Sequence, residues 1–288
     1  MNERNKILKE RLTKKEILVV PGAADALIAK IIEKNDFEAV YVTGGGVSYS
    51  TLGMPDMGFI TMSEMVQRTA CIAEAVNIPV ITDIDTGYGN ILNVVRTIKE
   101  FEKAGVSCVQ IEDQVFPKRC GHLDGKELVS KEEMVAKIKA CVDTRIDDNF
   151  MIMARADAIA VEGIDKAIER AVAYQEAGAD IAFVEATRTV EDMKKVTGAL
   201  DIPLLANMVE GGKTPLMPAK ELENIGYDIV IYPNSAIRVI AKAVFELMKE
   251  LKEKGTTRDY TSNMFLFDKI YGLVDVDQVR EWETKYYS

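Results

Sequence analysis

A short run near the middle of the chain brings together several residues that could transfer protons or bind anions. Lys118, Arg119, Cys120, Gly121 and His122 are consecutive, and His122 is the sole histidine of the sequence. Two cations can bind an anion, and they also lower the pKa of a neighbouring thiol and make it more reactive. We therefore predict that Cys120 acts as a nucleophile or a proton donor on a small acidic substrate, with a structural cysteine as the alternative.

The stretch 116–129, which contains this run, has the composition of a loop that can move. Gly121 and Gly125 lie within it and give its backbone conformational freedom. Loops of this kind close over substrates and exclude water. We expect this stretch to be a lid.

Carboxylates form a second group of candidate functional residues. Asp83 and Asp85 are two positions apart at the end of an apolar run, so both side chains can point to one side. With Glu112 they would form a site of oxygen ligands alone, which favours Mg²⁺ or Mn²⁺ over zinc. The alternative is that one of the two aspartates caps the following helix.

A glycine run follows another apolar segment. Thr43, Gly44, Gly45 and Gly46 are consecutive, and glycines let backbone N–H groups approach an anion closely. The GxGxxG spacing of a dinucleotide site is absent. Taken alone the run favours a tight turn, whereas the nearby carboxylates favour a carboxylate-binding nest.

The elements that must position these residues alternate along the chain. Short apolar runs, mostly without polar alternation, are separated by stretches with helical periodicity, as expected for strands buried on both faces. This pattern predicts a (β/α)8 TIM barrel, with an open doubly wound sheet as the alternative. The eight expected strands are 17–20, 39–42, 80–83, 109–112, 151–154, 181–184, 204–206 and 229–232.

Polar residues gather where these strands end. Strand five is followed by Arg155, strand six by Glu185 and strand seven by Asn207. Catalytic groups of such barrels lie at the C-terminal ends of the strands. Strand ends are often polar because they meet water, but that explains only one or two of these residues.

The chain continues beyond the eighth strand. A long helix is expected over 236–254, followed by an amphipathic tail that holds the only tryptophan, Trp282. We expect one barrel domain over 1–288, with about 236–288 as a C-terminal helical extension. This extension would pack against the barrel or reach a neighbouring subunit.

The bulk composition excludes several classes of protein. The chain has 288 residues, of which 48% are hydrophobic, and a net charge of −10 without a basic stripe that would bind nucleic acid. No apolar run is long enough to span a membrane. The four cysteines lack CxxC spacing, which favours a soluble cytoplasmic protein.

Several runs, in the same order, resemble the isocitrate lyase / phosphoenolpyruvate mutase superfamily. They include Tyr41 to Gly46, Asp83 to Gly89, Lys118 to His122 and Leu205 to Met208. The cysteine of the third run resembles the lyase branch rather than the phosphonomutases. The resemblance implies a barrel that exchanges its last helix between subunits, a homotetramer, and bound Mg²⁺.

The resemblance also implies roles for individual residues. Asp85 would ligate the metal, directly or through water, and Asp56, Asp83 and Glu112 would be outer or water-bridged ligands. The substrate carboxylate would be bound by Thr43, Gly44, Gly45 and Arg155, in a pocket completed by Glu185 and Asn207. The departing carboxylate would be bound by Lys118, Arg119, Gly121 and His122, which also close the lid.

The implied reaction is a retro-aldol (retro-Claisen) cleavage of a 2-hydroxy dicarboxylate to pyruvate and a second carboxylate. Tyr41 is our candidate for the base that takes the hydroxyl proton, and Cys120 would return a proton to carbon. Ala156, Val209 and Gly211 depart from the methylisocitrate lyase pattern. We therefore expect 2,3-dimethylmalate first, then methylisocitrate, then oxaloacetate hydrolysis or decarboxylation, and last phosphonomutase chemistry. The alternative from another functional class is a barrel that binds or assembles without catalysing a reaction.

Overall fold

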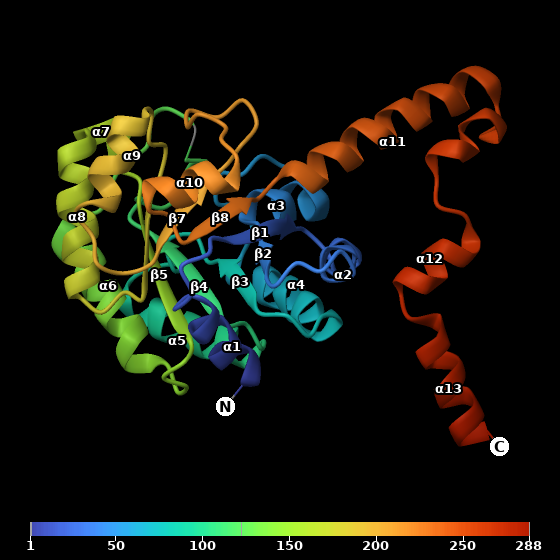
Figure 1. The fold of residues 1–288 in the computed structure, drawn as a ribbon, viewed down its shortest axis with the longest axis horizontal. Helices are drawn as coiled ribbons and strands as arrows, with labels where there is room; N and C mark the ends of the chain where they lie inside the picture. Colours follow the sequence, from blue (N-terminus) through green and yellow to red (C-terminus); the bar gives the residue numbers. More distant parts are fainter. Residues whose placement is uncertain (1, 122, 288) are drawn as a thin grey trace.

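The computed structural model describes residues 2–121 and 123–287. Eight parallel strands close into a barrel in the order β1 to β8, and helices surround it (Figure 1). The predicted (β/α)8 fold is therefore confirmed. The strands are β1 Leu18–Ala23, β2 Val40–Val42, β3 Val80–Asp83, β4 Cys108–Glu112, β5 Met151–Ala156, β6 Ile181–Val184, β7 Leu204–Asn207 and β8 Ile229–Tyr232.

The helices follow the strands in the expected alternation, with a few additional ones. Helix α3 lies between β2 and α4, and α7 is a short helix before α8. The helices that follow the strands are α2 Ala26–Glu33, α3 Gly44–Leu52, α4 Met62–Ala75, α5 Ile91–Lys103, α6 Lys131–Thr144, α7 Ile159–Glu162, α8 Ile164–Glu176, α9 Val190–Thr197 and α10 Ala219–Ile225. Helix α1, Glu3–Arg11, lies near the N-terminal ends of the strands (Figure 1).

The barrel interior is a packed core whose residues recur every second position along the strands. Ile81, Met153, Phe183 and Leu205 belong to one buried cluster. Successive strand residues point to opposite faces, so the residues two positions further on, at the C-terminal end, face inward as well. These residues are Asp83, Arg155, Glu185 and Asn207. The strand periodicity therefore brings the predicted polar residues to one end of the barrel.

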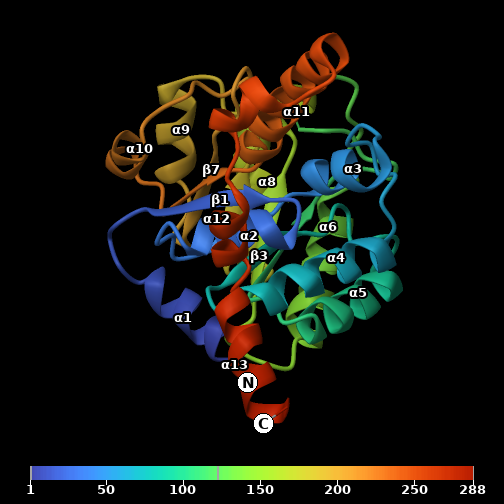
Figure 2. The same ribbon diagram turned by 90° about the vertical axis from the view of Figure 1, so that its right-hand side faces the viewer.

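The C-terminal segment forms an arm that leaves the barrel. It consists of α11 Ser235–Lys254, a 3₁₀ turn Arg258–Asn263, α12 Phe267–Leu273 and α13 Val276–Tyr287. Figure 1 shows α11 projecting from one side of the barrel, and in Figure 2 the rest of the arm runs in front of the barrel. Asp275, between α12 and α13, pairs with Lys30 and Lys34 of α2. None of the residues of α11 is buried. An exposed apolar stripe at helical spacing runs along it, formed by Ile240, Val244, Met248 and Leu251. Within the described residues, no helix is long and apolar enough to cross a membrane.

Candidate active site

A cavity of about 260 Å³ opens at the C-terminal ends of the strands, where the sequence places the site. Its size suits a small molecule. The predicted site residues that line it are Tyr41, Thr43, Gly45, Asp56, Asp83, Cys120, Gly121, Arg155, Glu185 and Asn207. The strand ends and the loop after β4 therefore do converge on one cavity.

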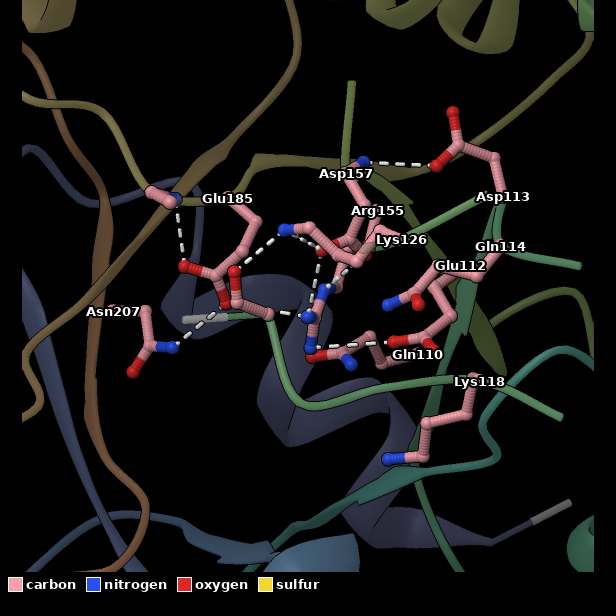
Figure 3. A network of polar contacts seen from close by, with 12 residues as sticks. Gln110, Glu112, Asp113, Gln114, Lys118, Lys126, Arg155, Asp157, Glu185 and Asn207 are labelled. Atoms are coloured by element: carbon pink, nitrogen blue, oxygen red, sulfur yellow. Dashed lines mark hydrogen bonds and ion pairs between the residues drawn. The ribbon is translucent and has the colours of Figure 1, made fainter. Parts of the chain in front are cut away.

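Arg155, at the end of β5, is the buried cation of this cavity. Its guanidinium donates to both carboxylate oxygens of Asp157, at 2.9 and 3.0 Å. It also lies 3.3 Å from Glu112 Oε2 and 3.4 Å from Glu185 Oε2 (Figure 3). Burial alone would lower the pKa of Arg155, but these three carboxylates outweigh it and raise the pKa well above its ordinary value. Arg155 is therefore a fixed positive charge, suited to an anionic substrate.

Asn207 and Glu185 form the neighbouring wall of the site. Asn207 Nδ2 donates to Glu185 Oε2 at 2.9 Å, and the Ala186 N–H donates to Glu185 Oε1 at 2.7 Å. Both bonds hold the Glu185 carboxylate toward Arg155 (Figure 3). The two predicted residues are thus rigid parts of the cavity wall.

The predicted metal ligands lie in the cavity wall or beside it, and two of them contact an ammonium group. Lys118 Nζ pairs with Asp56 and lies 2.9 Å from Asp85 Oδ1. Burial and the neighbouring Asp85 raise the pKa of Asp83 to about 7. Within the described residues, no group of three or more His, Cys, Asp or Glu side chains is arranged to hold a metal. The predicted three-carboxylate site is therefore not preformed around a single point.

The chemistry of this region nevertheless fits a divalent cation. Glu112 is completely buried, and neither of its carboxylate oxygens has a hydrogen-bond partner among the described residues. Asp83, Asp85 and Asp56 add hard oxygen donors, and Lys118 provides the compensating positive charge in their midst. Hard oxygen donors without nitrogen or sulfur suit Mg²⁺ or Mn²⁺.

The glycine run begins a helix rather than a turn. Thr43 is the N-cap of α3, and its hydroxyl oxygen accepts from Gly46 N at 3.3 Å. A Cβ at Gly44 would lie 2.7 Å from Asp83 Oδ2, so only glycine fits there. The glycines predicted to bind an anion therefore lie at a helix N-terminus, where N–H groups favour anions. The alternative prediction of a tight turn is therefore wrong.

Tyr41 has contacts that oppose its predicted role as base. Its hydroxyl donates to Gln110 Oε1 at 2.8 Å and is buried. Burial, together with Asp83, raises the pKa of Tyr41 well above its ordinary value. A phenol held neutral is a hydrogen-bond donor, which opposes the predicted role of Tyr41 as base.

The loop after β4 is folded onto the site, and its consecutive residues point in different directions. Cys120 is half-buried and lines the cavity, and Gly121 is buried beside Arg155. Arg119, in contrast, is exposed and lies against Gly125, outside the cavity, so its predicted role in binding the substrate is not supported. His122 lies outside the described residues.

Several residues of the site escaped the sequence prediction. Asn234 accepts from the Thr43 hydroxyl at 3.1 Å, and Arg238 lines the cavity from α11. Gln110 and Asp157 bind Tyr41 and Arg155, respectively. Gln110 lies two positions before Glu112 on β4, so the strand periodicity could have identified it. Arg238 has no local pattern that marks it.

Comparisons with known proteins agree with this architecture. A model of the phosphoenolpyruvate phosphomutase family matches residues 8–252. The chain is 52% identical over 279 residues to 2,3-dimethylmalate lyase of Eubacterium barkeri, covering 97% of this chain and 96% of that protein. It is 45% identical over 268 residues to 2-methylisocitrate lyase of Aeropyrum pernix, covering 93% and 86% of the two chains.

Solved structures give the same grouping. The fold matches a crystal structure of 2,3-dimethylmalate lyase with a TM-score of 0.92 and 33% identity, covering 98% and 95% of the two chains. It matches phosphonopyruvate hydrolase in complex with oxalate and Mg²⁺ with a TM-score of 0.89 and 31% identity, covering 99% of each chain. The chain therefore belongs to the phosphoenolpyruvate phosphomutase family, within the PEP mutase/isocitrate lyase superfamily.

Proposed function

We propose that the protein is a Mg²⁺-dependent carbon–carbon lyase that cleaves 2,3-dimethylmalate to pyruvate and propionate. The observation that carries the proposal is that one cavity joins Arg155, Cys120 and an apolar wall, with the buried carboxylates beside it. The 52% identity to 2,3-dimethylmalate lyase supports the choice of substrate.

The apolar wall favours a methyl-branched dicarboxylate over a tricarboxylate. Leu123, Phe183, Val209 and Ile231 line the cavity. Arg238 is the other arginine of the cavity. Its guanidinium donates to the backbone oxygen of Glu210 at 2.5 Å and to the Glu210 carboxylate at 3.4 Å. Methyl groups would gain from contact with this wall, whereas a third carboxylate would lose hydration without gaining an unshared cation.

The departures from the methylisocitrate lyase pattern act in different ways. Val209 and Gly211 line the cavity and can contact a substrate directly. Ala156 is completely buried in β5 and does not line the cavity. Substrate choice is therefore assigned to the loop after β7.

The proposed chemistry begins with recognition of the 2-hydroxy carboxylate. Arg155 and the N-terminus of α3 would bind its carboxylate. Asp83, Asp85, Asp56 and Glu112 would hold Mg²⁺, or Mn²⁺, which when bound stabilises negative charge on the oxygen at C2. Tyr41 and Gln110 keep the floor of the cavity neutral and hydrogen-bonded.

Cleavage of the C2–C3 bond then requires two proton transfers, one from the 2-hydroxyl oxygen and one to carbon C3. Transfer of the 2-hydroxyl proton to the carboxylate of Asp83, which lines the cavity, lets the electrons of the O–H bond form the carbonyl of pyruvate while the C2–C3 bond breaks. The electron pair of that bond remains on C3 as the enediolate of propionate. Cys120 then donates its proton to C3, as a general acid. Lys118 and His122 are assigned to the departing carboxylate.

The assembly is part of the proposal. The exposed apolar stripe of α11 would pack on a neighbouring subunit, and a cytoplasmic homotetramer would result. An arm that leaves its own barrel without burying a residue of α11 supports such an exchange.

The experiment that tests the proposed function measures pyruvate with a coupled lactate dehydrogenase assay. The panel contains 2,3-dimethylmalate, methylisocitrate, isocitrate and oxaloacetate, with and without Mg²⁺, and glyoxylate is measured for isocitrate. We expect Mg²⁺-dependent pyruvate release that is fastest with 2,3-dimethylmalate. No release from any substrate would support a barrel without this chemistry.

Methylisocitrate lyase is the second candidate function. The 45% identity to 2-methylisocitrate lyase favours it. Its products would be pyruvate and succinate, so measuring succinate and propionate in the same reaction separates the two candidates.

A further inference from the structure

We propose that Lys126 is a positioning residue that fastens the loop carrying Cys120 to the carboxylate that orients Arg155. Its expected effect on turnover rests on the proposed lyase function, whereas its effect on the loop does not. Lys126 belongs to the same loop as Cys120, but no part of the chemistry above uses it.

The ammonium group of Lys126 is placed where a loop lysine is seldom found. Its side chain is 1% exposed, and Nζ donates to the Gly121 backbone oxygen at 2.5 Å and to Asp157 Oδ1 at 3.0 Å. Figure 3 shows Lys126 pointing inward to Asp157, beside Arg155. Removing an ammonium group from water is costly unless its partners are well placed, so these two bonds must hold the closed loop firmly.

Asp157 connects this lysine to the substrate-binding arginine. Both of its carboxylate oxygens accept from Arg155, and its backbone N–H donates to Asp113 Oδ1 at 2.8 Å. Asp157 is completely buried, so its rotation is restricted. A side chain held on both sides in this way transmits the position of one partner to the other.

Lys126 also corrects the balance of charge around Arg155. The guanidinium faces Glu112, Asp157 and Glu185, which are three carboxylates for one cation. By pairing with Asp157, Lys126 leaves more of the positive potential of Arg155 for an anionic substrate.

The loop backbone rests directly on the groups that Lys126 helps to fix. A Cβ at Gly121 would lie 2.3 Å from Arg155 Nη2 and 2.6 Å from Glu185 Cγ. Because Lys126 binds the Gly121 carbonyl, it holds this contact closed. Cys120 precedes Gly121, so the hydrogen bond from Lys126 to the Gly121 carbonyl also fixes the position of the Cys120 thiol relative to Arg155.

The test compares Lys126→Met with the wild type by two readouts. The first is pyruvate release from 2,3-dimethylmalate; we expect kcat to fall roughly 100-fold, the order of loss that a misplacement of about 1 Å produces. The second is alkylation of Cys120 by iodoacetamide, followed by mass spectrometry, with the exposed Cys71 as internal reference. We expect faster alkylation of Cys120, because the released loop exposes the thiol.

Control variants separate the loss of this contact from a general effect. Lys131→Met removes a half-buried lysine of α6 that pairs with Glu169 outside the cavity lining, and should leave both readouts unchanged. Lys126→Arg keeps the positive charge, so it should restore part of the turnover and part of the protection of Cys120 from alkylation. If Lys126→Met does not fold, as judged by thermal melting, both measurements are made on Lys126→Gln.

Unchanged turnover, or a fall in turnover with unchanged alkylation of Cys120, would overturn the proposal. A wild type that releases no pyruvate from the panel would refute the proposed function instead. The alkylation comparison would still decide the role of Lys126.

Discussion

The ammonium group of Lys118 lies 2.9 Å from Asp85 Oδ1, inside the group of carboxylates that the sequence predicts to hold a metal. Lys118 belongs to the loop after β4 and Asp85 to the turn after β3, so the contact joins the loop to the site. The side chain of Lys118 is 2% exposed. We propose that a divalent cation and the ammonium group of Lys118 compete for these carboxylates, so that Lys118 would turn to an anionic substrate only when the carboxylates have another cation.

We predict from this that Lys118→Met destabilises the protein without metal and makes it more responsive to Mg²⁺. Removing one partner of a buried ion pair costs about 3–5 kcal/mol, because the other charge stays unpaired. Mg²⁺ that binds the folded state restores stability by mass action. Thermal melting in EDTA and in Mg²⁺ measures both effects.

The outcome for Lys118→Met is compared with that for Lys131→Met, which replaces a half-buried lysine of α6. The control should melt like the wild type in both buffers. An equal Mg²⁺ shift in Lys118→Met and the wild type would mean that the ion and the ammonium group do not compete.

The close approach of Gly44 to Asp83 gives a second prediction. In Gly44→Ala the new Cβ would lie 2.7 Å from Asp83 Oδ2, so either the start of α3 or the carboxylate must move. We expect a higher KM and a lower kcat, since both the anion site and the carboxylate are displaced. In the control Gly272→Ala the new Cβ meets open space; kinetics as good in Gly44→Ala as in this control would contradict the assignment.

The barrel could be predicted because its strands are buried on both faces, but strand ends could not be placed from apolar runs alone. Strand β5 continues to Ala156, which pairs with Val184, although the polar Arg155 interrupts the apolar pattern. Strand β7 likewise includes Asn207. Arg155 and Asn207 are inward-facing members of these strands, so the apolar pattern ends before the strand does.

The site itself was only partly predictable, since sequence neighbours do not share a direction. Lys118 and Arg119 are adjacent, yet the first is buried among carboxylates and the second is exposed. Lys126 and Arg238 come from a loop and a helix, and only long-range packing brings them to the site. Their charges would suit a solvated surface equally well.

The position of Cys120 on the cavity predicts a selective loss of turnover. Cys120→Ser replaces the thiol by a much weaker acid, so we expect kcat to fall about 10²–10⁴-fold, the usual worth of a general acid. KM should change little, because the carboxylate-binding groups remain. The coupled pyruvate assay measures both, and Cys71→Ser, at an exposed cysteine of α4, is the matched control. Near-normal turnover would remove Cys120 from the mechanism.

The apolar stripe of α11 predicts an oligomer that a single charge weakens. Val244 is 48% exposed in this chain, and a partner surface would bury it. Val244→Glu should therefore shift the mass measured by analytical ultracentrifugation toward smaller species, because a buried unpaired charge opposes association. Lys252→Gln, on the same helix, should keep the wild-type mass. Equal masses for all three proteins would refute packing through this stripe.

The ion pairs of Asp157 predict how stability depends on pH in acid. Burial alone would raise the pKa of Asp157, but Arg155 and Lys126 outweigh it and lower the pKa from 3.8 to about 2. A carboxyl whose folded-state pKa lies below its unfolded-state value stabilises the protein above the unfolded-state pKa. That contribution, about 2 kcal/mol for a shift of this size, is lost as the pH falls through the folded-state pKa.

Urea unfolding of the wild type and Asp157→Asn from about pH 4.5 down to about pH 3 measures this contribution. The variant lacks the titrating group and should be less stable than the wild type at the upper end, because Arg155 and Lys126 lose their partner. The difference in the free energy of unfolding between the two proteins should shrink as the pH falls, since only in the wild type does protonation of Asp157 in the unfolded chain stabilise the unfolded state. A difference that stays constant over this range would mean that Asp157 has the same pKa in the folded and unfolded states, and that its two ion pairs do not stabilise its charge.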